Sequence, residues 1–275
     1  MDLLLRGLSD IAGGDEVAAR DAADHTDYVR FAALLGQRLG EMHQVLGRPS
    51  SDPAFAPTTG TAATGESFAE RAREQLSAAY RAMGAVEDDD RRMMEAAREA
   101  LFVKLSTMTN LVEGTTLTRI HGDMHLGQVL VCNGDVVIID FEGEPAKPVE
   151  ARRGKDHPLR DVAGMVRSFD YAAAVVKRRS QASHAHLTDE QVKAFLDSFV
   201  PRATEAFLAG YQDAIKLGNE QAEATVKTEL LDLFLIEKAS YEVVYEGANR
   251  PTWIDVPLHG LANCTRHLLG IEALA

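Results

Sequence analysis

One short stretch in the middle of the chain constrains the fold most, because it combines a polar loop with a tight hairpin. Residues 129–131 and 136–139 are apolar or β-branched, and Asn133-Gly134 between them is typical of a hairpin turn. A hairpin returns its two ends to one place, so the polar residues that flank it are expected to lie close together. These residues are Asp123, Gln128 and Asp140.

Two carboxylates and an amide at one place suit phosphoryl transfer, which depends on positioning and on neutralising charge. In protein kinases a metal-binding amide stands five residues after the catalytic Asp, and a D-F-G Asp follows a hairpin. Here Gln128 stands five residues after Asp123, and Asp-Phe-Glu-Gly begins at Asp140. The spacing predicts Asp123 as the base that accepts the proton of a substrate hydroxyl. Gln128 and Asp140 are predicted to bind Mg²⁺ on the phosphates of a nucleotide.

Two other interpretations of these residues stay open. A His-Gly-Asp turn can be a purely structural loop, and a buried Asp can cap backbone amides. Alternatively, a hydrolytic Zn²⁺ site can be built from alternating histidines and acids. Its ligands would be His121, Asp123, His125 and Asp140. That scheme gives no role to the following Gln or to the hairpin, so we favour phosphoryl transfer.

Composition limits the class of protein. The 275 residues are enough for one large core or two modest ones. A net charge of −13 argues against general binding to nucleic acids or anionic membranes. With only two cysteines, no disulfide framework is suggested. We see no signal peptide and no apolar run of transmembrane length, and expect the chain to be cytoplasmic.

Nearly everything outside the hairpin is predicted to be helical, because apolar residues recur at spacings of three and four. The fold class is therefore mainly α, with one small β-hairpin. Residues 48–65, rich in Pro, Ser, Thr and Gly, are expected to form a mobile loop. Asp161, on the first turn of a helix, is a candidate to bind the backbone of the catalytic loop and hold it rigid. The expected helices cover residues 28–46, 66–83, 89–107, 158–179, 188–215 (with a break allowed at Pro201), 220–245 and 257–271.

Four segments together resemble actinobacterial maltokinases, from about residue 28 to the C-terminus. The family has an aminoglycoside-phosphotransferase-like, protein-kinase-like α+β fold and makes maltose 1-phosphate from ATP and maltose. The resemblance implies a place in the route from trehalose to glycogen, with trehalose synthase as a partner. Related glucosamine kinases share the catalytic loop, so glucosamine, another sugar or an aminoglycoside is the alternative acceptor. The four segments are residues 121–130, 139–145, 158–171 and 241–253.

The resemblance also implies the residues of the site. Asp123 is the base, and Gln128 and Asp140 bind Mg²⁺. His121 supports the loop, together with Asp161. In the sugar site, aromatic faces would cover a pyranose while carboxylates and Arg bind its hydroxyls. The implied substrate-binding residues are His125, Glu142, Glu144, Tyr241, Glu242, Tyr245, Glu246, Arg250 and Trp253. Core packing is the competing interpretation for the three aromatic residues.

The front of the chain departs from the family. Such kinases carry an N-terminal lobe with strands and a phosphate-contacting lysine, and neither pattern precedes residue 28. The sequence predicts a hinge-like segment over 1–27 and a catalytic, sugar-binding C-lobe over 28–275, with the N-lobe absent. We therefore expect a truncated or split maltokinase, with a separate N-lobe polypeptide as a partner, or a non-catalytic sugar-binding remnant.

Overall fold

The computed structural model describes residues 25–84, 88–145, 147–183, 188–218 and 228–271, so most of the predicted hinge-like segment lies outside the described residues. The described chain is mainly helical, as predicted. None of its helices is long and apolar enough to cross a membrane. The α-helices are α3 (Thr26–Leu46), α4 (Ala62–Ala82), α5 (Asp89–Thr107), α6 (Val149–Arg152), α7 (Leu159–Ser183), α8 (Asp189–Gly218), α9 (Thr228–Asn249) and α10 (Asp255–Leu269). Short 3₁₀ turns are η1 (Met108–Val112), η2 (Leu126–Gln128) and η3 (Pro251–Trp253).

Capping and packing explain where the helix ends differ from the sequence prediction. Helix α4 begins four residues early, because Thr61 and Thr64 form a reciprocal capping box in place of a start at Glu66. Helix α8 continues through Pro201, so the break allowed there is absent. Phe199 and Phe207 flank the proline and are fully buried, and their burial offsets its local cost of about 3 kcal/mol.

Two short antiparallel pairs make up the strands of the described residues. The predicted hairpin is present as β3 (Val129–Cys132) and β4 (Asp135–Ile138). The second pair, β1 (Thr58–Thr59) with β2 (Thr116–Leu117), was not predicted and ties down part of the expected loop over 48–65. A strand of two residues leaves no periodic pattern in the sequence from which it could be predicted.

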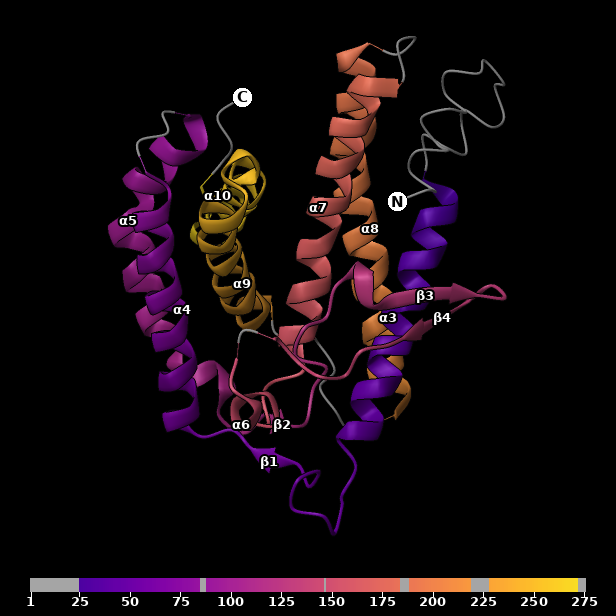
Figure 1. Cartoon of the computed structure of the whole chain (residues 1–275). Coiled ribbons are helices and arrows are strands. Elements are labelled where there is room, and N and C mark those ends of the chain that lie inside the picture. Colours follow the sequence, from indigo (N-terminus) through magenta and orange to yellow (C-terminus); the bar gives the residue numbers. More distant parts are fainter. Residues whose placement is uncertain (1–24, 85–87, 146, 184–187, 219–227, 272–275) are drawn as a thin grey trace. The chain divides into compact units, whose positions relative to one another are not determined.

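The chain divides into two units, which we describe separately. The first, here the hairpin unit, comprises residues 1–45, 125–140 and 168–224. In it α3 and α8 lie side by side (Figure 1), and small residues allow the close approach. A Cβ at Gly36 would lie 2.0 Å from the Phe207 carbonyl oxygen, and one at Gly210 would lie 2.0 Å from that of Ala33. The aromatic rings of Tyr28 and Phe199 pack edge to face nearby.

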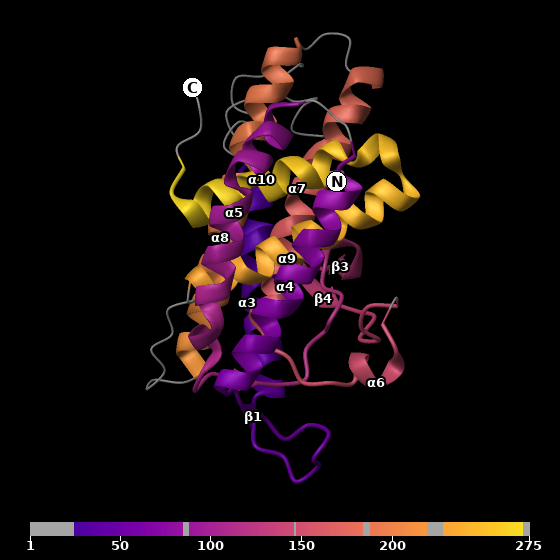
Figure 2. The ribbon, with the colours of Figure 1, turned by 90° about the vertical axis from the view of Figure 1, so that its left-hand side faces the viewer.

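The second, here the four-helix unit, comprises residues 46–124, 141–167 and 225–275. Helix α9 contacts both α4 and α10, and α10 also contacts α5. Figure 2 shows α10 lying across the long axis of α5. Helix α9 has buried residues on several of its faces, as expected for a helix covered on several sides. Its fully buried apolar side chains are Leu230, Leu233, Phe234, Ile236, Ala239 and Val243.

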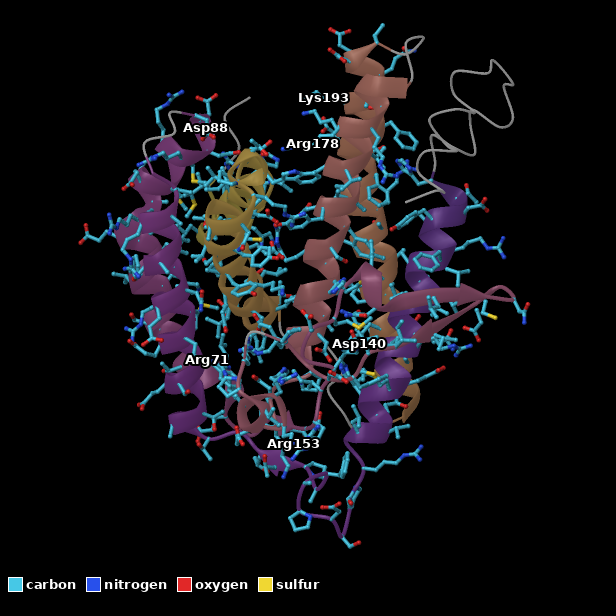
Figure 3. The ribbon with its side chains drawn as sticks, viewed as in Figure 1. Arg71, Asp88, Asp140, Arg153, Arg178 and Lys193 are labelled. Atoms are coloured by element: carbon cyan, nitrogen blue, oxygen red, sulfur yellow. The ribbon has the colours of Figure 1, made fainter. Side chains whose placement is uncertain are left out.

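A charged network crosses the core of the four-helix unit. The Arg160 guanidinium donates to both oxygens of Glu237 on α9, at 2.8 and 3.0 Å, and lies 2.9 Å from Asp156. Arg71 of α4, labelled in Figure 3, reaches the same Asp156 oxygen at 3.4 Å. Burial opposes ionisation of Asp156, but the charges of Arg160 and Arg71 outweigh it and lower the pKa of that carboxyl. The network links α4, the start of α7 and α9.

Candidate active site

The hairpin takes its shape from the Asn-Gly pair at its tip. Asn133 and Gly134 have φ angles of 52° and 78°, the two left-handed residues that a type I′ turn requires. The strands pair from Val129 opposite Ile138 to Cys132 opposite Asp135. Beyond the strands, the Ile139 amide donates to the Gln128 carbonyl at 3.0 Å. The ladder therefore continues to the open end, where Gln128 and Asp140 stand.

Gln128 and Asp140 meet at that open end. The Gln128 amide Nε2 donates to Asp140 Oδ2 at 3.1 Å, so the two side chains are directed to one point. Asp140, labelled in Figure 3, has a φ of 65°, a left-handed conformation that Asp tolerates better than most residues. The pair offers an amide and a carboxylate oxygen, donors of the kind that Mg²⁺ prefers. Because Mg²⁺ commonly takes only one or two protein ligands beside phosphates and waters, this donor set fits the ion.

In the four-helix unit, the loop over residues 121–124 is held by a buried carboxylate. Asp161 is 1% exposed and accepts hydrogen bonds from the backbone amides of His121 at 2.7 Å and Gly122 at 2.8 Å. The His121 Nδ1 accepts from the Asp123 amide at 3.3 Å, and its ring lies against Phe141. These bonds fix the backbone on which the Asp123 side chain stands.

The close approach of α7 to this loop depends on one small residue. A Cβ at Gly164 would lie 2.4 Å from the Met124 carbonyl oxygen, so a side chain there would push the loop away. Gly164 follows Asp161 by three residues and lies on the same face of α7. One face of α7 therefore both accepts hydrogen bonds from the loop, at Asp161, and leaves room for it, at Gly164.

A compact charged cluster surrounds Asp123 within the four-helix unit. The Lys238 ammonium of α9 lies 4.0 Å from Asp123 Oδ1 and 5.1 Å from the centre of the Tyr241 ring. Tyr241 is hydrogen-bonded to Glu144, which also pairs with Lys147 at 2.8 Å. The structure thus brings three predicted site residues together and adds a lysine that the sequence analysis missed.

The pKa values of two cluster members are coupled. Burial opposes ionisation of Glu144, but its bond to Lys147, the nearby Lys238 charge and the Tyr241 hydroxyl outweigh this and lower its pKa. Burial and the Glu144 charge raise the pKa of Tyr241, which stays a hydrogen-bond donor at neutral pH. The cluster thus holds an ionised carboxylate beside a phenolic hydroxyl.

The remaining predicted residues of α9 fall into a buried row and an exposed row. Glu242, on the buried row, accepts from Arg167 Nε at 2.9 Å, and Arg167 is itself 1% exposed. Glu246, also 1% exposed, pairs with Arg250 at 2.5 Å. Both carboxylates are thus committed to arginines and hold the fold together.

The exposed row carries the predicted aromatic residues. The rings of Tyr241 and Tyr245 stack with 6.3 Å between their centres. The Arg250 guanidinium lies 6.0 Å from the Tyr245 ring centre and 5.4 Å from that of Trp253. Tyr245 is 45% exposed, so a flat apolar surface is open to a ligand. This row comprises Tyr241 and Tyr245 of α9 and, beyond the end of α9, Arg250 and Trp253. Tyr245 and Arg250 are exposed, whereas Tyr241 and Trp253 are half-buried.

His125 and Glu142 are placed differently. The His125 Nδ1 accepts from the Gly127 amide at 3.0 Å and caps the short η2 turn. The Glu142 residue is exposed, and its backbone carbonyl accepts from Arg152 at 3.4 Å. Neither contact shows what the side chain would bind, so the substrate-binding role of both residues stays a prediction. His125 belongs to the hairpin unit, and Glu142 to the four-helix unit.

The predicted residues are divided between the two units. The predicted metal ligands Gln128 and Asp140 belong to the hairpin unit, as does His125. The predicted base Asp123, its support and the other implied sugar residues belong to the four-helix unit. The convergence of Asp123 with Gln128 and Asp140 therefore stays a prediction. In the part of the chain that the structure describes, no three His, Cys, Asp or Glu side chains are grouped to hold a metal ion. The Zn²⁺ hydrolase interpretation gains no support from this arrangement.

Comparison with known proteins adds an independent finding. Residues 5–196 match the model of a family described as "Phosphotransferase enzyme family". Two relatives are called glucosamine kinase. One, from Streptacidiphilus jiangxiensis, is 27% identical over 82% of this chain and 47% of its own length. The other, from Mycolicibacterium smegmatis, is 29% identical over 87% of this chain and 55% of its own length.

Solved structures show the same fold. A glucosamine kinase in complex with glucosamine, ADP and inorganic phosphate superposes with a TM-score of 0.72 at 24% identity, over 95% of this chain and 56% of its own. A second crystal form of a glucosamine kinase gives a TM-score of 0.73 at 25% identity, over 95% of this chain and 56% of its own. The chain thus spans about half the length of the relatives it matches.

Proposed function

Because this chain belongs to the Phosphotransferase enzyme family, we propose that it is the catalytic part of a kinase that transfers the γ-phosphoryl group of ATP to a sugar hydroxyl. The observation that carries the proposal is the hydrogen-bonded Gln128–Asp140 pair at the open end of the hairpin, in which Gln128 stands five residues after Asp123 in the sequence. That spacing is the one at which kinases place a base before a metal-binding amide.

In the proposed reaction, Asp123 accepts the proton of the sugar hydroxyl while the hydroxyl oxygen attacks the γ-phosphorus. The new phosphorus–oxygen bond forms as the bond to the β-phosphate oxygen breaks, and ADP leaves. Asp161 and His121 hold the loop so that the Asp123 carboxylate keeps one orientation. Gln128 and Asp140 would hold Mg²⁺, which when bound neutralises charge on the phosphates.

Glucosamine is the acceptor that we place first. The resemblance of the motifs pointed to maltose, whereas the relatives are called glucosamine kinases, which favours the alternative acceptor. Glu144 and Tyr241 are proposed to bind sugar hydroxyls, since both lie in the cluster around Lys238, whose ammonium is next to Asp123. Tyr245 and Trp253 are proposed to cover an apolar sugar face.

Other predicted sugar ligands are ranked by their contacts. Glu242 and Glu246 already bind arginines in buried positions, so we propose that they stabilise the fold and do not bind the sugar. Arg250 pairs with Glu246 but its side chain is half exposed, so it is proposed to bind a sugar hydroxyl as well. His125 and Glu142 rank below it, because no contact directs either of them to a ligand. The cytoplasmic location remains an expectation. No comparison supports trehalose synthase or a separate N-lobe polypeptide as a partner.

The direct test is to titrate the purified chain with ATP and Mg²⁺, with glucosamine and with maltose, by calorimetry. Sugar-dependent release of ADP is measured in parallel. We expect heat with nucleotide and with glucosamine, and ADP release that requires the sugar. Heat with sugar but none with nucleotide would instead identify a non-catalytic sugar-binding module, while sugar-independent ADP release would point to hydrolysis.

A further inference from the structure

A lysine beside the proposed base is the strongest feature that the proposed function leaves unused. Lys238 is a half-buried residue of α9, one helical turn before Tyr241. Its ammonium lies 4.0 Å from Asp123 Oδ1 and over the Tyr241 ring. The Lys238 side chain is 29% exposed and the Asp123 side chain 21%, so water screens their attraction only in part.

The charges in this cluster are balanced. Asp123 and Glu144 contribute two negative charges, while Lys238 and Lys147 contribute two positive ones. Lys147 binds Glu144 directly at 2.8 Å, and Lys238 acts on both carboxylates. A cationic ligand that enters beside Asp123 therefore meets no surplus negative charge.

The other carboxylates along this part of α9 cannot supply such a charge. Glu237 is bound by Arg160, Glu242 by Arg167 and Glu246 by Arg250. Each of these pairs is internally neutral and at least partly buried. The charge next to the base is thus controlled by one residue, Lys238.

Given the proposed sugar kinase activity, on which this step rests, we infer that Lys238 is a specificity-determining residue that sets the preference between cationic amino sugars and neutral sugars. Its ammonium takes the position beside Asp123 that the ammonium of an amino sugar would otherwise occupy. A neutral sugar can instead place a hydroxyl there, as an acceptor for a Lys238 hydrogen bond. Lys238 therefore lowers the affinity for a cationic amino sugar relative to its neutral analogue without abolishing it, so glucosamine binds, but less tightly than it would without Lys238.

The experiment compares glucosamine with glucose, because the two differ at one position only, where an amino group replaces a hydroxyl. Calorimetry gives both dissociation constants below the pKa of the sugar amine, and needs no nucleotide. Lys238→Met removes the charge and keeps the apolar stem, while Lys238→Gln is a second neutral variant that can still form hydrogen bonds. Lys238→Arg keeps the charge. Lys104→Met is the matched control, since Lys104 pairs with the surface residue Glu229 in the same unit.

We expect both neutral variants to raise the ratio of glucosamine affinity to glucose affinity about tenfold, the effect of one partly screened charge. Lys238→Arg and Lys104→Met should keep the wild-type ratio. If either neutral variant binds both sugars with the wild-type ratio, the role of Lys238 is overturned and the kinase proposal stands. If the wild-type chain binds neither sugar, the sugar site of the proposed function itself is overturned.

Discussion

The hairpin and helix α9 are built in opposite ways. In the hairpin, Gln128 and Asp140 are 12 residues apart, and an Asn-Gly turn between them is enough to bring them together. On α9, the partners come from distant segments: Arg167 and Glu242 are 75 residues apart in sequence. The comparison teaches that a local site can be identified from spacing, whereas a helix face acquires its roles from what packs against it.

Asp123 tests both sides of this comparison. Its loop is close in sequence to Gln128 of the hairpin, whereas its neighbour Lys238 comes from a segment far away in the sequence. We expect Asp123→Asn to lower kcat about 10³-fold, since the amide cannot accept the hydroxyl proton. The sugar dissociation constant should change little. Steady-state kinetics and calorimetry provide the two measurements, with Asp52→Asn on a surface turn as the control. An unchanged kcat would contradict the assignment of the base.

Glu242 tests whether the buried row of α9 is structural. Glu242→Gln removes the negative charge that the buried Arg167 guanidinium faces, so the free energy of unfolding should fall by about 3 kcal/mol. Glu229→Gln, which breaks an exposed pair with Lys104, should change it by less than about 1 kcal/mol. Denaturant titration measures both. A stable Glu242→Gln variant that has lost sugar affinity would return Glu242 to the sugar site.

Asp161 connects a helix end to a local loop. Asp161→Ala leaves the amides of His121 and Gly122 without their acceptor, which should cost about 2 kcal/mol of stability. Because the loop then loosens, kcat should also fall while the sugar dissociation constant stays near the wild-type value. Asp161→Asn, which keeps one acceptor oxygen, should recover part of both losses. Equal losses in the two variants would mean that the two amide bonds do not hold the loop.

Asp156 gives a pH test of the distant network. Its pKa is lower in the folded chain than in the unfolded one, so the stability it contributes is complete above the ordinary Asp pKa of about 3.9. That contribution is lost as pH falls through the lowered value. Asp156→Asn should therefore be less stable than wild type at neutral pH, by about 1–2 kcal/mol, and the difference should shrink at acid pH. Chemical denaturation at several pH values measures it; a constant difference would contradict the linkage.

The smallest expected effect is at the hairpin tip. Gly134 has a φ of 78° and no heavy atom near the position of a Cβ, so Gly134→Ala carries only a backbone cost of about 1 kcal/mol. Asn133→Gly, at a φ of 52°, should be nearly neutral and serves as the control. A cost well above this would mean that the hairpin depends on more than its own turn.

The sequence predicts those features of the chain whose signals come from residues close together in the sequence. The Asn-Gly turn, the spacing of Asp123 and Gln128, and most helix boundaries can be inferred from neighbouring residues, since turn and helix signals act over a few positions. Lys238 carried no such signal. A lysine on an amphipathic helix is ordinarily a solvated residue, and only the loop that reaches α9 places Asp123 beside it.

By itself, the sequence determined a mainly helical chain and a hairpin whose open end joins an amide to a carboxylate. It did so because φ preferences and side-chain periodicity depend on adjacent residues. The tertiary structure alone decided which carboxylates of α9 are buried beside arginines and which side chains face a ligand. Helical spacing makes Glu242 and Tyr241 equally plausible site residues. The tertiary structure separates their roles. Arg167 packs against Glu242 in the core, whereas Tyr241 is only half-buried and lies beside the exposed Tyr245.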